Sequence, residues 1–337
     1  MRRSRGWIRR LWREEEGVLS AAVRTLLLPA EGFYRLVVSV RNQCYDLGIF
    51  SGERPAIPVI SVGNLAVGGT GKTPISAWLV SQLSKSGRQA ALVIRGYGFD
   101  EVGLHTSWNS DSLVVVNARR ARGIDQAVAM GADVAILDDG FQHRRVHRDI
   151  DIVLLAAEHG LGNALLPRGL FREPIAALVR AHVILVTRKT AKVEKALRLE
   201  AEIANVAPWA RRGRIHFQIS DWTDLEGSLV EAPKGDVLVV TSIAEPESFL
   251  DMVQSEGSSS AVAFPFPDHH EFSEDDVLRI GDAAQNRTLV MTEKDAIKLR
   301  RFSRALPLSY VLRIRPEWES GREEVMALIS DMLGKEN

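Results

Sequence analysis

Apolar runs rich in β-branched residues alternate with segments of helical spacing from residue 57 onward. The first series of runs predicts strands at Ile57–Val62, Ala90–Ile94, Val134–Leu137, Ile150–Leu155 and Val183–Val186. Helical spacing lies between several of these strands, notably over Pro74–Ser84 and Gly123–Met130. Almost wholly apolar strands that alternate with helices are typical of a parallel sheet covered on both faces. We therefore predict an α/β fold.

A second α/β series follows residue 214, with strands predicted near Val237–Val240, Ala261–Phe264, Leu289–Met291 and Tyr310–Ile314. The basic, irregular stretch Pro208–Arg214 separates the two series and is a candidate hinge. We therefore predict a core domain over residues 51–207 and a second, smaller α/β domain over residues 208–337.

The first 50 residues have a different pattern, because arginines crowd the start and apolar residues lie between them at helical spacing. Trp7, Ile8, Leu11 and Trp12 begin this apolar series. A helix with tryptophan and leucine on one face and arginine on another suits a membrane interface. A helix that packs on a protein core has the same amphipathic pattern, so both interpretations stay open for residues 1–50.

Composition narrows the class of protein. Hydrophobic residues make up 45% of the 337 residues and charged residues 26%, which is ordinary for a folded protein with a sizeable core. Basic and acidic residues number 43 each, so no global field recruits nucleic acid. Cys44 is the only cysteine, which excludes an intrachain disulfide and fits a reducing cytosol. The longest uncharged stretch, Pro55–Gly71, contains prolines and a glycine cluster and is not a membrane span.

The strongest chemical signal is a glycine-rich loop between a predicted strand and a predicted helix. Residues Ile60–Thr73 read I-S-V-G-N-L-A-V-G-G-T-G-K-T. Glycines let backbone N–H groups converge on phosphate oxygens, and the helix start adds positive potential. The pattern predicts an ATP site formed by Gly68, Gly69, Thr70, Gly71, Lys72 and Thr73. Lys72 would contact the β- and γ-phosphates, and the Thr73 hydroxyl would bind Mg²⁺.

The first position of this phosphate-loop pattern is Ala66, which fits only its relaxed form. An ordinary glycine-rich turn is the alternative. The strand before the loop, the helix after it and the adjacent Gly-Lys-Thr favour the phosphate loop.

A pair of carboxylates ends another predicted strand. Asp133–Asp139 reads D-V-A-I-L-D-D. In P-loop enzymes an acidic residue at the end of a neighbouring strand holds magnesium, so Asp138 and Asp139 are candidate ligands. A strand that simply ends in a polar turn is the alternative, and the phosphate loop favours magnesium.

Several runs together resemble the tetraacyldisaccharide 4′-kinase family. They are S-V-G-N-L-A-V-G-G-T-G-K-T-P (Ser61–Pro74), R-G-Y-G (Arg95–Gly98), L-D-D-G-F-Q-H-R (Leu137–Arg144), L-L-P-R-G-L-F-R-E-P (Leu165–Pro174), F-P-D-H-H (Phe266–His270) and T-E-K-D-A-I-K-L (Thr292–Leu299). The runs occur in the family's order. The phosphate loop is shared by many proteins, whereas L-D-D-G-F-Q-H together with F-P-D-H-H is far more specific.

The resemblance implies a kinase that uses ATP and Mg²⁺ to phosphorylate the 4′-hydroxyl of the tetraacyldisaccharide 1-phosphate precursor of lipid A. It implies a P-loop core, a smaller C-terminal domain that closes the cleft, and a peripheral or monotopic position on the cytoplasmic face of the inner membrane. That position favours membrane contact for residues 1–50. The sequence does not specify an oligomeric state.

The resemblance also implies that an aspartate paired with a histidine activates the acceptor hydroxyl. The histidine corresponds to His269, and Asp100 in Phe99–Val102 is the nearest match to the aspartate's motif. A neutral imidazole can orient a carboxylate in this way. The alternatives are a solvated loop carboxylate for Asp100 and, for His269, a cap on the helix that begins near Ser273.

Four further residues are candidates for the acceptor side of the site by the same resemblance: Asn64, His143, Arg172 and Glu173. Asn64 would support the loop or touch the acceptor. Arg172 has the planar fork that matches a phosphate, and a structural ion pair is the alternative for Arg172 and Glu173. The role of Thr292–Asp295 is left open.

Two other functions compete with this reading: a P-loop ATPase or switch protein, and a kinase of a soluble metabolite. Guanine-specific switches carry Asn-Lys-x-Asp late in the sheet, and neither Thr187–Lys189 nor Thr292–Asp295 fits that element. The amphipathic start of the chain argues against a soluble metabolite as the acceptor.

Overall fold

The computed structural model describes residues 18–96, 99–109, 112–162, 164–256 and 260–334. The chain forms two compact units. The larger unit comprises Met1–Arg95, Ser112–Ile215 and Trp318–Asn337, and the smaller unit comprises Gly96–Asp111 and His216–Glu317. This division differs from the one drawn from the sequence, because each unit is made of separate stretches of chain.

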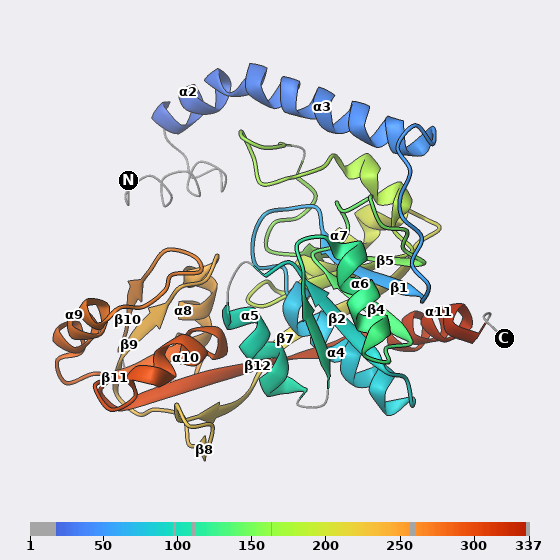
Figure 1. The fold of residues 1–337 in the computed structure, drawn as a ribbon. Coiled ribbons are helices and arrows are strands. Elements are labelled where there is room, and N and C mark those ends of the chain that lie inside the picture. Colours follow the sequence, from blue (N-terminus) through green and yellow to red (C-terminus); the bar gives the residue numbers. More distant parts are fainter. Residues whose placement is uncertain (1–17, 97–98, 110–111, 163, 257–259, 335–337) are drawn as a thin grey trace. The chain divides into compact units, whose positions relative to one another are not determined.

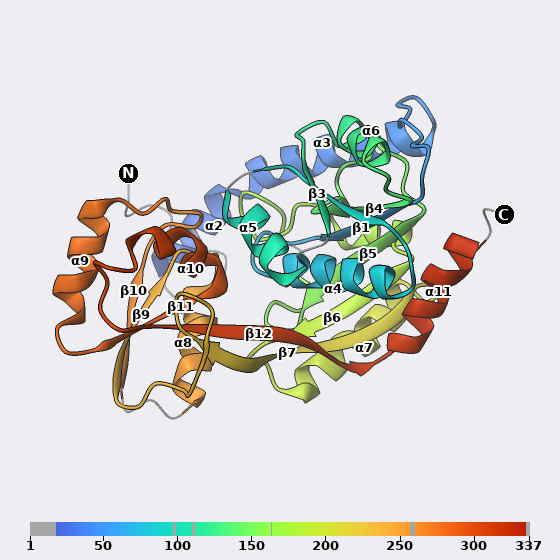
Figure 2. The ribbon, with the colours of Figure 1, turned by 60° about the horizontal axis from the view of Figure 1, so that its bottom comes forward.

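The larger unit contains a parallel sheet with the strand order β6-β5-β1-β4-β2-β3 (Figure 1 and Figure 2). Its strands are β1 (Val59–Asn64), β2 (Ala90–Ile94), β3 (Leu113–Val116), β4 (Val134–Asp138), β5 (Ile150–Ala156) and β6 (Val183–Arg188). Every residue of β1, β2, β4 and β5 is buried. The prediction of a parallel sheet covered on both faces is therefore confirmed.

Helices cover both faces of this sheet. They are α4 (Lys72–Lys85), α6 (Arg120–Ala129) and α7 (Val193–Val206). Ile124 of α6 packs with Ala91 and Val93 of β2, and α4 lies on the other face of the same strands (Figure 2). The larger unit also contains α2 (Val18–Leu26), α3 (Leu28–Asp46), the 3₁₀ helix η1 (Ile175–Arg180) and α11 (Arg322–Gly334).

Strand β1 lies between β4 and β5, so the chain leaves β1 toward one side of the sheet and later returns on the other. Parallel sheets bind ligands beyond the carboxyl ends of the strands at such a switch point. The phosphate loop follows β1 directly, and Asp138 is the last residue of β4. The topology therefore brings the two predicted phosphate and metal elements to one edge of the sheet.

The smaller unit has a sheet with the order β10-β9-β11-β12-β7, and β8 pairs with β7 in antiparallel orientation. Its strands are β7 (Arg211–Thr223), β8 (Leu229–Val230), β9 (Asp236–Thr241), β10 (Ser260–Pro265), β11 (Thr288–Thr292) and β12 (Ser309–Ser320). Strands β7 and β12 each contain residues of both units. The helices are α5 (Phe99–Trp108), α8 (Pro246–Ser255), α9 (Glu274–Ala284), α10 (Glu293–Leu299) and the 3₁₀ helix η2 (Arg300–Phe302).

Alternate residues of β9 face two separate cores. Leu238 and Val240 pack in the core that includes Ala296 and Leu299 of α10. Val237 and Val239 pack in the core formed with α8. Helices α10 and α8 therefore lie on opposite faces of this sheet, since successive strand residues point to opposite sides.

Three sequence predictions need correction or qualification. The candidate hinge Pro208–Arg214 is not irregular throughout: a turn is followed by the start of β7, whose buried and less buried positions alternate. The segment around Asp100 is helix α5 and not a loop. Residues 1–17 of the predicted amphipathic segment lie outside the described residues.

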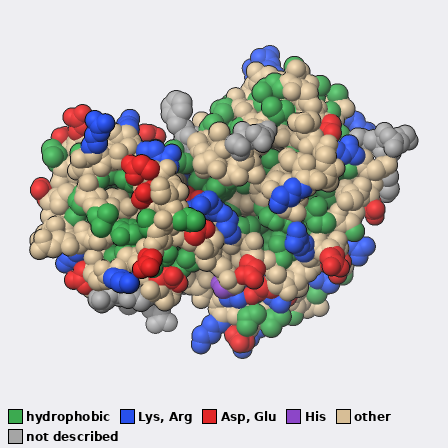
Figure 3. Space-filling model, turned by 90° about the horizontal axis from the view of Figure 1, so that it is seen from below, with side chains coloured by type: hydrophobic (Ala, Val, Ile, Leu, Met, Phe, Trp, Pro, Cys, Tyr) green, Lys and Arg blue, Asp and Glu red, His purple; other side chains and the backbone are tan. Residues whose placement is uncertain are grey.

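Charged side chains of both signs are interspersed on the face shown in Figure 3. This mixture agrees with the equal numbers of basic and acidic residues, 43 of each.

Gly63→Ala should destabilise the larger unit. A Cβ at position 63 would lie 2.4 Å from Cβ of Phe141 and 2.9 Å from its backbone nitrogen, so buried β1 would have to shift. We expect a loss of about 1–3 kcal/mol in the free energy of unfolding, measured by chemical denaturation.

Gly281→Ala is the matched control, because a Cβ there meets no described atom within 4 Å and Gly281 lies inside α9. We expect that variant to be neutral or stabilised by about 0.5–1 kcal/mol. Equal stability of the two variants would contradict the close approach of β1 to Phe141.

Candidate active site

The phosphate loop runs from the end of β1 to the start of α4. Gly68 has φ of 133° and Gly71 has φ of 89°, conformations that residues with a Cβ rarely adopt. Lys72 and Thr73 open α4, and Gly71 is its N-cap. A glycine-rich turn that opens a helix is a place where backbone N–H groups can bind an anion, so this geometry is compatible with the predicted site.

Side chains from neighbouring strands hold the loop by its backbone. The Thr187 hydroxyl donates to the Thr70 carbonyl at 3.0 Å, and Lys189 Nζ donates to the Gly69 carbonyl. Asn64 Nδ2 donates to the Thr70 hydroxyl at 2.8 Å. Asn64 is fully buried, so its position favours support of the loop over contact with the acceptor. The loop is thus preorganised by β1 and β6.

Asp138 faces the start of α4. Its Oδ2 lies 3.5 Å from the Thr73 hydroxyl, and its Oδ1 accepts from the Ser76 hydroxyl at 3.2 Å. One Mg²⁺ ion with bonds of about 2.1 Å can bridge oxygens about 3.0–4.2 Å apart, so Thr73 and Asp138 fit this ion. Among the described residues no cluster of three or more His, Cys, Asp or Glu side chains suits a metal. A P-loop magnesium site needs none, since phosphates and water complete it.

Asp139 faces two cations. Its carboxylate lies 3.7 Å from Lys72 Nζ and 2.9 Å from Arg172 Nη1. Burial acts to raise the pKa of Asp139, but Lys72 and Arg172 outweigh burial and lower it below its ordinary value. Asp139 is therefore ionised at neutral pH and holds Lys72 and Arg172 in place. The sequence left two roles open for Arg172, contact with a phosphate and a structural ion pair. In the structure its guanidinium forms the ion pair with Asp139.

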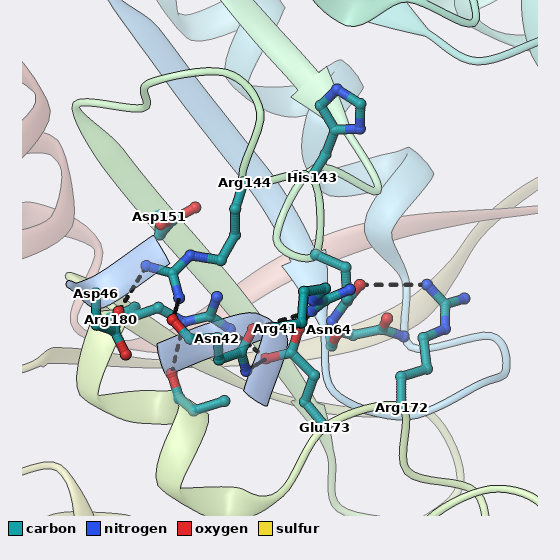
Figure 4. A network of polar contacts seen from close by, with 12 residues as sticks. Arg41, Asn42, Asp46, Asn64, His143, Arg144, Asp151, Arg172, Glu173 and Arg180 are labelled. Atoms are coloured by element: carbon teal, nitrogen blue, oxygen red, sulfur yellow. Dashed lines mark hydrogen bonds and ion pairs between the residues drawn. The ribbon is translucent and has the colours of Figure 1, made fainter. Parts of the chain in front are cut away.

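His143 lies in a basic environment. Burial, together with the charges of Arg120, Arg148, Arg145 and Arg95, lowers the pKa of His143 from 6.5 to about 4. The imidazole is therefore neutral at pH 7, when it can donate through one nitrogen and accept through the other. Figure 4 shows its ring pointing away from the ion pairs around Glu173.

Glu173 is fully buried and binds α3 to the rest of the larger unit (Figure 4). It accepts from Arg41 Nη2 at 2.8 Å, from Asn42 Nδ2 at 3.3 Å and from Arg180. The Tyr34 hydroxyl of α3 donates to the carbonyl of Arg172 at 3.0 Å. These contacts favour a structural role for Glu173 over the predicted contact with the acceptor.

Helix α3 buries a carboxylate and exposes several large apolar side chains. Buried Glu31 accepts from the Leu165 backbone N–H at 2.8 Å, from Arg35 at 3.1 Å and from Arg168. Large exposed side chains follow the outer side of α2, α3 and the turn after them: Leu26, Leu28, Phe33, Leu36, Val37, Val40, Leu47, Ile49 and Phe50. No helix in the described ranges has the length and hydropathy of a membrane span.

His269 belongs to the smaller unit and has a positive φ of 57°. Its backbone N–H donates to the Ser242 carbonyl at 3.1 Å, and its Nε2 lies 3.5 Å from Lys294 Nζ. Ser273 caps α9 through a capping box with Asp276, so the alternative role of His269 as that cap is wrong. The neighbouring His270 contacts Asp276 at 2.8 Å.

Asp100 lies in the first turn of α5, which also belongs to the smaller unit. Its side chain lies outside the described part of the chain. The two residues predicted to form a pair, Asp100 and His269, thus share one unit, whereas Lys72, Thr73 and Asp138 share the other.

Sequence reasoning missed several residues that support the site. Arg120 is 4% exposed and donates to the Asp138 carbonyl at 2.8 Å, and Ser76 binds the carboxylate of the same residue. Lys189 reaches the phosphate loop from the end of β6. Buried arginines are rare, and nothing in the sequence marks Arg120 as one of them.

The chain matches the family model described as tetraacyldisaccharide-1-P 4′-kinase over residues 23–112 and 100–333. A tetraacyldisaccharide 4′-kinase of Anaeromyxobacter dehalogenans (strain 2CP-1 / ATCC BAA-258) is 37% identical and covers 86% of this chain and 84% of that protein. A second, of Anaeromyxobacter sp. (strain Fw109-5), is 34% identical and covers 97% of each. The crystal structure of LpxK from Aquifex aeolicus in complex with ATP has a TM-score of 0.72 and 25% identity, covering 92% of this chain and 99% of that one.

The low pKa of His143 makes the larger unit sensitive to mild acid. The folded state binds this proton only near pH 4, whereas an unfolded histidine binds it near pH 6.5. Between these values the unfolded state binds more protons, so the contribution of His143 to stability falls as the pH falls from about 6.5 to about 4. NMR titration of the His143 ring, assigned with His143→Gln, should give a midpoint near 4. A midpoint at 6 or above would contradict the buried, arginine-rich environment.

Proposed function

The chain belongs to the tetraacyldisaccharide 4′-kinase family, and on that premise we propose that the phosphate loop of its larger unit carries out the family's phosphoryl transfer. The protein is a kinase, and it transfers the γ-phosphate of ATP to the 4′-hydroxyl of the acylated disaccharide. The observation that supports this assignment is the geometry of the phosphate loop, in which Lys72 faces Asp139 and Thr73 faces Asp138. The two competing functions, a switch protein and a kinase of a soluble metabolite, are not favoured.

The loop binds the nucleotide through charge and fixed donors. Backbone N–H groups of Gly68–Gly71 hold the phosphates, and Lys72 contacts the β- and γ-phosphates. Thr73 and Asp138 would hold Mg²⁺, whose charge offsets that of the terminal phosphates. Asp138 is the better candidate ligand because Asp139 already pairs with Lys72 and Arg172.

Asp139 has a different role in this proposal. With Arg172 it keeps the Lys72 ammonium directed toward the loop, so that little rearrangement is needed when the γ-phosphate moves. Neutral His143 can donate a hydrogen bond to an oxygen of the acceptor. The arginines around His143 would attract an anionic group of that acceptor. Phosphoryl transfer asks mainly for positioning and charge neutralisation, and these residues supply both.

The smaller unit supplies the pair that accepts the hydroxyl proton. Asp100 takes the proton from the 4′-hydroxyl as the γ-phosphoryl group is transferred, and His269 orients Asp100. The presence of both residues in one unit and the turn that fixes His269 support this assignment.

The outer side of α3 is the proposed contact with the membrane surface. An amphipathic helix normally buries its large apolar side chains, but α3 leaves several of them exposed. Its buried side carries Glu31 and contacts Glu173, whereas Phe33 and Leu36 are 70% and 60% exposed. An apolar medium such as the acyl boundary of the inner membrane fits this outer side, and a peripheral position there brings the enzyme to its acylated substrate.

Lys72→Ala and Asp100→Ala should lose activity to different degrees. Lys72→Ala removes the cation on the γ-phosphate and should weaken ATP binding and nearly abolish turnover. Asp100→Ala should lower kcat about 10²–10⁴-fold with ATP affinity unchanged, because it removes proton acceptance alone. Lipid phosphorylation and ATP binding are measured with Mg²⁺, and Lys85→Ala, an exposed lysine on the same helix, is the control. Normal ATP binding by Lys72→Ala would overturn the loop assignment, and full turnover by Asp100→Ala would overturn the base.

Phe33→Ser with Leu36→Ser should weaken membrane binding. The two side chains are largely exposed, so their loss should cost little in stability. Removing their apolar area should reduce partition into anionic phospholipid vesicles by about tenfold or more, measured by sedimentation. Leu278→Ser is the control, since Leu278 is 67% exposed on α9. An equal loss for the control would show that general surface hydrophobicity, and not α3, drives binding.

A further inference from the structure

We propose that helix α10, with the T-E-K-D-A-I-K segment Thr292–Lys298, is the positioning element that fixes the geometry between Asp100 and His269. This inference rests on the proposed function of that pair. The residues of this segment do not themselves react in this proposal. They position the reacting pair, which is a role for the motif Thr292–Lys298 outside the P-loop chemistry.

The first contact of this segment is with the turn that carries His269. Asp295 of α10 is fully buried and accepts from both the backbone N–H (3.0 Å) and the hydroxyl of Ser242. The Ser242 carbonyl in turn accepts from the His269 backbone N–H at 3.1 Å. Asp295 therefore fixes Ser242, and Ser242 fixes the backbone of His269.

Lys298 anchors the next residue of the same turn. Its ammonium donates to the Ser242 hydroxyl at 2.7 Å and to the His270 carbonyl at 3.1 Å, and it lies 3.8 Å from the Asp295 carboxylate. The backbone on both sides of the His269 side chain is thus held by α10: the N–H of His269 through Ser242, and the carbonyl of His270 directly by Lys298. This matters because His269 has a positive φ of 57°, a conformation that a residue with a Cβ keeps only when its surroundings impose it.

Lys294 approaches the imidazole itself. Its Nζ lies 3.5 Å from His269 Nε2, at the outer limit of a hydrogen bond. An ammonium can only donate, so this contact favours the tautomer whose proton is on Nδ1. A histidine in that tautomer presents an N–H donor on Nδ1, which is what orienting a carboxylate requires.

The second contact of the segment is with α5, the helix that carries Asp100. Glu293 Oε1 accepts from Trp108 Nε1 at the end of α5 at 2.8 Å. Glu293 is itself held by Arg313 at 3.2 Å and by Arg315 at 2.8 Å from β12. The end of α5 is therefore fixed to α10 through a carboxylate that has little freedom to move.

The middle of α5 is fixed by close packing. A Cβ at Gly103 would lie 2.9 Å from Cγ2 of Ile297, so α5 and α10 approach more closely than any larger residue at 103 allows. Position 100 lies one turn before Gly103 along α5. Because α10 is bound both to the turn of His269 and to the helix that carries Asp100, it constrains the separation of these residues, and His269 can orient Asp100 only within hydrogen-bond reach.

The experiment compares Gly103→Ala and Glu293→Gln with wild type. Gly103→Ala should push α5 away from α10. Glu293→Gln should weaken the contact with Trp108 while the side chain at position 293 keeps almost the same size. We expect kcat to fall about 10–100-fold, while KM for ATP stays unchanged because the phosphate loop belongs to the other unit. An unchanged kcat in both variants would overturn the inference.

A double-mutant cycle separates positioning from general support. Each variant is also made in the His269→Ala background, in which the pair no longer works. If α10 acts through the pair, Gly103→Ala and Glu293→Gln should lower kcat by less than twofold in that background. An equal fold-loss in both backgrounds would overturn the inference. Full activity of His269→Ala alone would instead overturn the proposed role of the pair, so the two failures are distinguishable.

Val253→Ala is the matched control for stability. Val253 is buried in the core formed with α8, on the face of the sheet opposite α10. This variant should lower the unfolding midpoint of the smaller unit with kcat unchanged. A loss of kcat in Val253→Ala as large as that in Glu293→Gln would attribute both effects to stability and overturn the inference.

Discussion

The larger unit depends on one constraint, which is that the carboxyl ends of parallel strands meet at one edge of a sheet. Strand β1 delivers the phosphate loop there, β4 delivers Asp138 and Asp139, and β6 delivers Thr187 and Lys189. None of these groups is close to the others in the sequence. Because β1 lies between β4 and β5 and is buried along its whole length, the loop that follows it has a fixed starting point.

Neighbouring carboxylates acquire different chemistry from this arrangement. Asp138 keeps ordinary strand geometry and faces Thr73, whereas Asp139 has φ of 54° and faces Lys72 and Arg172. Repulsion between two adjacent anions is relieved because each has its own partners. Two buried carboxylates at α3 follow the same rule, since Glu31 of α3 and Glu173, which binds α3, each accept from at least three donors.

Much of the fold could be predicted from the sequence, because strands buried on both faces leave continuous apolar runs. The run at Ala90–Ile94 matches β2 residue for residue, and those of β1, β4, β5 and β6 agree within two residues. Helix α5 was missed because Gly103 weakens its helical pattern and because its packing partner, α10, lies almost 200 positions later. The separate tasks of Asp138 and Asp139, the burial of Asn64 and the ion pair of Arg172 depend on backbone angles and on distant side chains, which local patterns do not encode.

The discontinuity of the units has a consequence for how this chain can be divided. The polypeptide passes from one unit to the other after residues 95, 111, 215 and 317. No single cut of the chain therefore releases either unit intact. If the chain ended after β7, α5 would lack its packing partner α10, and the larger unit would lack α11. Neither unit can consequently be exchanged between relatives as one contiguous segment of chain.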